Sequence, residues 1–76
     1  MNHMADAGVQ VEVYDDVEAL APRIVVSLPA MPRVGEYLSV EADGGYFEYL
    51  ILREVWYRQE GQGGPFRACI RIELDD

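Results

Sequence analysis

Cys69 is the side chain with the clearest capacity for covalent chemistry, because it is the only thiol in the chain and arginines flank it. Arg67 and Arg71 lie two residues to either side, so all three side chains share one face if this segment is a strand. Nearby cations lower the pKa of a thiol and favour the nucleophilic thiolate. Nucleophilic catalysis also needs a base, and no histidine stands near this segment. We therefore expect Cys69 to be a small packing residue.

The other residues of catalytic type lack the neighbours that catalysis requires. His3 is the only histidine and lies in an N-terminal segment without a hydrophobic pattern. Glu48 and Glu54 have the chemistry of a glycosidase pair, but such a pair needs a cleft, and a small barrel is filled with side chains. The glycines of residues 61–64 lack the Lys-Ser/Thr end of a phosphate-binding loop, and the acidic residues 15–18 lack the spacing of a calcium loop. We expect no enzyme activity, no cofactor and no metal site.

Composition indicates one small acidic domain. The chain has 76 residues, with 14 carboxylates against six arginines and no lysine, and its formal net charge is −8. Half of the residues are hydrophobic, which is too many for a disordered chain, and no apolar run approaches the roughly 20 residues of a membrane-spanning helix. We expect a single cytoplasmic domain over residues 1–76, with no signal peptide or membrane segment and with residues 1–7 disordered. The charge opposes nucleic-acid binding and suits a basic protein partner.

Five segments alternate apolar and polar residues with the period of two that marks a half-buried strand. They are residues 9–13, 23–28, 36–41, 46–58 and 66–74. The prolines of residues 29–35 predict an extended segment that turns sharply at Gly35, where glycine tolerates a positive φ. Asp43-Gly44-Gly45 predicts a tight turn between the third and fourth strands. Residues 15–21 have the composition either of a short helical turn or of a loop, and the sequence leaves both open.

The alternation breaks within the longest segment. Leu50 and Leu52 share one parity, whereas Val55 and Tyr57 share the other. A β-bulge near residues 53–54 would return all four side chains to one face and would bend the strand, as a small barrel requires. Short strands joined by tight turns therefore predict an all-β fold: a single small five-stranded antiparallel SH3-like barrel, with an OB-like barrel as the alternative.

Part of this pattern is similar to a known class of proteins. It comprises Leu28-Pro29 followed by Pro32-Arg33-Val34-Gly35-Glu36, then Leu50-x-Leu52-x-x-Val55-x-Tyr57 and the closing alternating strand. From residue 28 to residue 74, the series resembles small SH3-like barrel proteins of bacteria and their mobile elements, including phage and integron-cassette products. The resemblance implies the barrel fold and a mobile-element source, and it brings no functional residue with it.

Several large apolar side chains occupy the positions of these strands that are expected to face outward, away from the barrel core. We predict that the following residues form an interface: Val25, Tyr37, Phe47, Tyr49, Ile51 and Trp56. Aromatic residues with arginine nearby are typical of the parts of interfaces that contribute most binding energy. Two alternatives stay open. These residues would be the core if the parity is wrong, or the N-terminal segment would cover them within one chain.

These observations predict a non-enzymatic module that binds protein or associates with itself, with a homodimer as the first expectation. The alternative is an acidic inhibitor, a nucleic-acid mimic of the anti-defence kind, that acts on a basic protein partner. Direct nucleic-acid binding by the aromatic residues with Arg53 and Arg58 is a third interpretation, which the net charge opposes.

Overall fold

The computed structural model of the protein describes residues 8–75. The strands are β1 (Val9–Tyr14), β2 (Ile24–Leu28), β3 (Tyr37–Glu41), β4 (Phe47–Gln59) and β5 (Phe66–Leu74), and a single 3-10 turn, η2 (Asp43–Gly45), joins β3 to β4. All five predicted strands are confirmed, each within two residues of its expected bounds. The expected disorder of residues 1–7 and the interpretation of His3 both lie outside the described residues.

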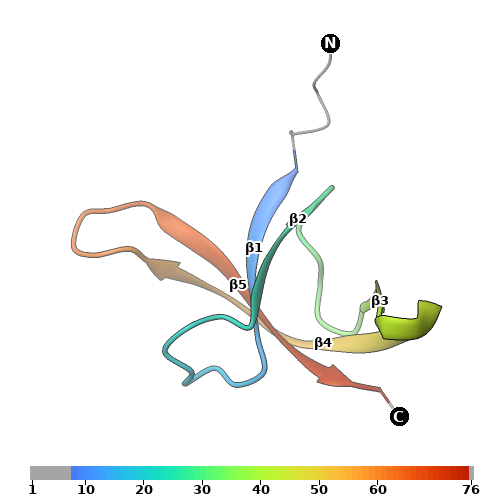
Figure 1. Ribbon diagram of the computed structural model, residues 1–76. Helices are drawn as coiled ribbons and strands as arrows, with labels where there is room; N and C mark the ends of the chain where they lie inside the picture. Colours follow the sequence, from blue (N-terminus) through green and yellow to red (C-terminus); the bar gives the residue numbers. More distant parts are fainter. Residues whose placement is uncertain (1–7, 76) are drawn as a thin grey trace.

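The strands form one curled sheet in the order β2-β1-β5-β4-β3 (Figure 1). The all-β prediction is confirmed, but the prediction that every strand pair is antiparallel is wrong for one pair. β1 and β5 run parallel, with Val11 opposite Ala68 and Val13 opposite Ile70. A parallel pair needs a long crossover connection, and here the intervening strands supply it. β2 and β3 form the two edges and are not paired with one another, so the described sheet curls without closing.

The hydrophobic core lies on one face of this sheet. Its buried members are Val11, Val13, Leu50, Leu52, Ala68, Ile70 and Ile72. They come from the three central strands, β1, β5 and β4, because only these strands have neighbours on both sides. The edge strands contribute partly buried side chains such as Val26 and Leu38. The thin core is therefore centred on β5, the strand in the middle of the sheet.

The predicted bulge in β4 is present. The pairing of β4 with β5 shifts register between Leu52 and Glu54, so that Leu52 lies opposite Ile72 and Val55 lies opposite Ile70. Since one extra residue separates them, Leu52 and Val55 face the same side of the sheet despite their opposite parity. The inward positions of Leu50, Leu52 and Val55 are therefore confirmed, whereas Tyr57, which shares the parity of Val55, is 59% exposed and is not part of the core.

A tight turn at Gly35 starts β3. The amide of Glu36 donates to the Arg33 carbonyl at 3.0 Å, and Gly35 has a φ of 94°. The Gly35 amide donates to the Leu52 carbonyl at 2.9 Å, and the Leu52 amide donates to the Glu36 carbonyl at 2.9 Å. Gly35 and Glu36 thus both lie opposite Leu52. This arrangement is a β-bulge of the type that places glycine at positive φ. This is the conformation that the sequence predicted for Gly35.

Residues 15–21 form a loop rather than a helix, which decides the alternative that the sequence left open. The Ala19 amide donates to the Asp16 carbonyl at 3.1 Å, and the Glu18 amide donates to the Asp16 carboxylate at 2.9 Å. These bonds close one turn, and the chain then returns to β2 as the Arg23 amide donates to the Val13 carbonyl at 2.7 Å. Across residues 8–75, no helix has the length and apolar character needed to cross a membrane.

Candidate functional site

A carboxylate is buried on the face of the sheet opposite the core. Glu12 on β1 is only 9% exposed, and its carboxylate accepts hydrogen bonds from the Tyr14 hydroxyl at 2.7 Å and from Arg58 at 2.8 Å. Arg67 forms a second ion pair with it at 3.7 Å. A buried carboxylate requires such partners, because its desolvation is otherwise too costly. The strands that carry these groups are β1, β4 and β5, which are adjacent in the sheet.

Tyr14 links this carboxylate to a second aromatic ring, that of Trp56. Tyr14 is fully buried, and its ring centroid lies 5.4 Å from that of Trp56 at an interplanar angle of 45°. The Arg58 guanidinium lies over the Tyr14 ring, 5.4 Å from its centroid, and also donates to the Tyr14 hydroxyl. Burial, assisted by the hydrogen bond to Glu12 and its negative charge, raises the pKa of Tyr14 to about 12. The cluster is thus a packed polar network.

Tyr14 is expected to ionise well above the ordinary pKa of a tyrosine. Its folded-state pKa of about 12 lies above the ordinary value of 10, so its contribution to stability is complete below pH 10 and is lost as pH rises from 10 through 12. Absorbance at 295 nm, recorded from pH 8 to pH 13, should show a late component that Tyr14→Phe removes. If Tyr14→Phe leaves the late component intact, the hydroxyl is not buried as described.

Cys69 belongs to the same network and is unsuited to nucleophilic chemistry. It is fully buried, and its sulfur lies 3.8 Å from the Glu12 carboxylate. Burial and the neighbouring Glu12 charge raise the pKa of the thiol. Arg67, one of the two cations that flank Cys69 in sequence, donates to Glu60 at 2.9 Å. Arg71, the other, bonds Glu54 and Glu73 instead of activating the sulfur.

Every arginine in the chain has a carboxylate partner. Arg23 pairs with Asp15, Arg33 with Glu36, Arg53 with Glu73, Arg58 with Glu12, Arg67 with Glu12 and Glu60, and Arg71 with Glu54 and Glu73. Hydrogen bonds from Arg71 and Arg53 lower the pKa of Glu73. Since Arg53 and Arg58 are engaged within the chain, a nucleic acid would have to displace these ion pairs to reach them.

Four of the six predicted interface residues gather on the β3–β4 hairpin. Tyr37 lies opposite Ile51, and Tyr49 and Phe47 continue along the same face of β4. Tyr37, Phe47 and Tyr49 are 52%, 57% and 53% exposed, whereas Ile51 is half-buried. We call these four residues the hairpin aromatic surface. Such a contiguous patch of half-exposed aromatics is uncommon on a monomer.

The other two predicted interface residues lie apart from this surface. Trp56 is half-buried and packs against Tyr14, and Val25 lies on edge strand β2, opposite Glu12. Tyr14 of β1 therefore contacts Trp56 within one molecule. The alternative that the N-terminal segment covers the predicted interface within one chain involves residues 1–7, which lie outside the described residues.

Carboxylates without an arginine partner are concentrated near the same hairpin. Among residues 8–75 they are Asp16, Glu18, Glu41, Asp43, Glu48 and Asp75, and the last four lie on or beside the β3–β4 hairpin. The Asp75 amide donates to the Tyr49 carbonyl at 2.9 Å, and hydrogen bonding to the Asp75 carboxylate raises the pKa of Tyr37. Sequence analysis missed this grouping, because it depends on which carboxylates the arginines engage and on the return of Asp75 to the hairpin.

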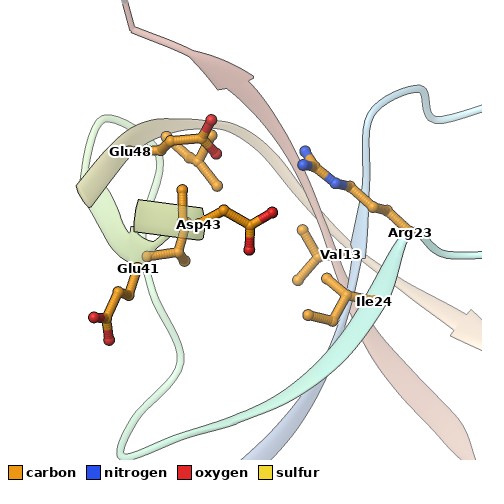
Figure 2. A pocket seen from close by; sticks show the side chains of 9 residues that line it. Val13, Arg23, Ile24, Glu41, Asp43 and Glu48 are labelled. Atoms are coloured by element: carbon orange, nitrogen blue, oxygen red, sulfur yellow. The ribbon is translucent and has the colours of Figure 1, made fainter. Parts of the chain in front are cut away.

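A pocket of about 360 Å³ opens between this hairpin and the start of β2. Figure 2 shows Asp43 and Glu48 on one side and Arg23, Val13 and Ile24 on the other. Glu54 lies in a different part of the sheet, where it pairs with Arg71. The structure thus does not bring Glu48 and Glu54 together as an acid–base pair.

The fold and these surfaces define an all-β domain built on an open, curled, mixed five-stranded sheet. No family model, curated protein or solved structure matches the chain. The described residues contain no group of three histidine, cysteine, aspartate or glutamate side chains placed to hold a metal ion. Function must therefore be argued from the surfaces themselves.

Proposed function

We propose that this protein is a non-enzymatic interaction module that associates with itself through the hairpin aromatic surface. The observation that carries the proposal is the exposure of Tyr37, Phe47 and Tyr49, each more than half exposed, on one face of adjacent strands. Burial of apolar area contributes roughly 25 cal/mol per Å², and aromatic side chains dominate interface energetics. A domain this small gains burial by association that its own core cannot supply.

Several finer predictions accompany this proposal. The consecutive antiparallel order of β3, β4 and β5 supports kinship with SH3-like barrels, and the parallel pairing of β1 with β5 opposes it. A mobile-element source and a cytoplasmic location also stay predictions. The proposed self-association depends neither on the barrel type, nor on the source of the protein, nor on its location.

The oligomeric state tests the proposal directly. Light scattering behind size exclusion, from about 5 to 500 µM, is expected to give a dimer for the native chain and a folded monomer for Tyr49→Glu. Phe66→Glu is the matched control, because Phe66 is 65% exposed at the far end of β5, away from the hairpin aromatic surface. Trp56→Glu is unsuitable as a test, since Trp56 packs on Tyr14 and its loss would affect folding.

The salt dependence of self-association has a definite sign. Two chains that each carry a formal charge of −8 repel one another, so raising the salt concentration from 50 to 500 mM should strengthen a dimer held by apolar contacts. A native chain that is monomeric at 500 µM in both salts would contradict the proposal. So would a dimer that Phe66→Glu disrupts and Tyr49→Glu leaves intact.

The acidic-inhibitor alternative receives narrower support. Among the residues that the structure describes, the carboxylates without arginine partners gather at two places, the β1–β2 loop and the β3–β4 hairpin, instead of following one continuous strip. Mimicry of a phosphate backbone would favour such a strip. A local contact with a basic protein segment at the hairpin fits the distribution better.

A further inference from the structure

The outer edge of β3 offers backbone groups for pairing. The Leu52 amide donates to the Glu36 carbonyl at one end of the hairpin, and the Ala42 amide donates to the Tyr46 carbonyl at the other. Because hydrogen-bonded pairs alternate along an antiparallel ladder, the even-numbered residues of β3 bond β4. The backbone groups that point away from β4 belong to Tyr37, Ser39 and Glu41. Within residues 8–75 no other strand pairs with this edge.

The space beside this edge has room for side chains. A pocket of about 410 Å³ lies between Leu28 of β2 and Leu38 of β3, with Met31 on its wall. The pocket of Figure 2 lies farther along, between Ile24 of β2 and Val40 of β3. Both pockets occupy the gap where the curled sheet fails to close. A strand added to β3 would direct alternate side chains into this gap.

The charge at one end of the gap identifies the kind of segment that fits. Asp43 and Glu48 line the pocket of Figure 2 together with Glu41, whose side chain points away from it, and no arginine pairs with any of the three within the described residues. Arg23, on the opposite wall, is already paired with Asp15 at 3.4 Å. Within residues 8–75, a second copy of this chain offers no arginine without a carboxylate partner. The complementary occupant is a lysine- or arginine-bearing segment of another protein.

We propose that the β3 edge binds an extended segment of a basic protein by strand addition. The segment carries an apolar residue and, two or four positions along and hence on the same face, a lysine or arginine. An apolar side chain enters the gap near Leu38, and a lysine or arginine lies near Asp43 and Glu48. Main-chain hydrogen bonds to Tyr37, Ser39 and Glu41 give affinity, while the pockets and carboxylates give specificity. This activity goes beyond self-association, because it uses the strand edge and not the aromatic face.

Peptide binding by the full chain tests the charge requirement. A fluorescein-labelled heptapeptide with lysine at positions 1 and 7, valine at positions 3 and 5 and threonine between them is the probe, because its lysines and valines share one face of a strand. The same peptide with glutamate in place of lysine is its control. Fluorescence anisotropy should show binding of the lysine peptide only. Asp43→Asn with Glu48→Gln should weaken it about tenfold, whereas Asp16→Asn with Glu18→Gln, which changes the net charge equally, should alter it less than about twofold. Equal weakening by both pairs, or no binding, would overturn the proposal.

Two further readouts separate strand addition from general charge attraction. Exchange of the Ser39 amide hydrogen should slow on peptide binding, while that of the Leu38 amide, already bonded to β4, should not change. Ser39→Pro removes only an outward-facing N–H on an edge strand, so the variant should fold and lose binding. Undiminished binding by Ser39→Pro would refute strand addition. Tyr49→Glu, which tests self-association, should still bind the peptide, so the two proposals fail independently.

Discussion

Glu12→Ala is expected to lower the free energy of unfolding by about 2–4 kcal/mol. The substitution leaves the buried Tyr14 hydroxyl without its acceptor and removes the carboxylate partner of Arg58. A domain of this length has a total stability of roughly 4–11 kcal/mol, so the loss is a large fraction of the whole. Urea denaturation followed by Trp56 fluorescence measures it, because that ring packs on Tyr14.

Two controls define the origin of this effect. Glu12→Gln keeps an oxygen that can accept from Tyr14, and we expect a smaller loss of about 1–2 kcal/mol. Glu54→Ala breaks the ion pair between Arg71 and the half-exposed Glu54 carboxylate. It should lower the free energy of unfolding by less than about 1 kcal/mol. If Glu12→Ala costs no more than Glu54→Ala, the carboxylate of Glu12 is not desolvated in the folded protein.

Ile70→Ala is expected to destabilise the protein by about 2–5 kcal/mol. Ile70 is fully buried in the middle strand, between Val13 on β1 and Val55 on β4. Its truncation leaves a cavity at the point where the two halves of the core meet. Chemical denaturation monitored by circular dichroism should show the midpoint fall with an unchanged slope.

Leu74→Ala is the matched control for Ile70. Leu74 is on the same strand and also faces the core side, opposite Leu50, but it is 54% exposed. We expect a cost below about 1 kcal/mol. A similar cost at both positions would mean that the core is not organised around the centre of β5.

The strands and the bulge could be predicted because they are properties of short stretches. Leu50 and Leu52 conflict in parity with Val55 and Tyr57, and an inserted residue is the simplest way to keep them on one face. Gly35 could be predicted in the same way, because a sharp turn after two prolines favours a residue that tolerates positive φ. In each case the information lies within a few residues.

The arrangement of strands and the polar network could not be predicted, because they depend on which segments become neighbours. The alternation of apolar and polar residues in β1 does not show whether its partner strand runs parallel or antiparallel to it. Glu12 appeared as an ordinary solvent-facing residue of an alternating strand. It is buried because Tyr14, Cys69 and Arg58 come from three adjacent strands to surround it. A usable signal was present, since Glu12 and Tyr14 share the outward parity of Trp56.

The position of β5 has a consequence for the time at which the protein can fold during its synthesis. β5 is the last of these five strands to be translated, yet it lies between β1 and β4 in the sheet. Until residues 66–74 leave the ribosome, the β1–β2 and β3–β4 hairpins have no strand that joins them. Isolated hairpins are marginally stable in water. A nascent chain truncated before residue 66 would therefore be two unjoined hairpins with exposed edges, open to proteases and chaperones, and the native sheet would appear only once the last strand is released.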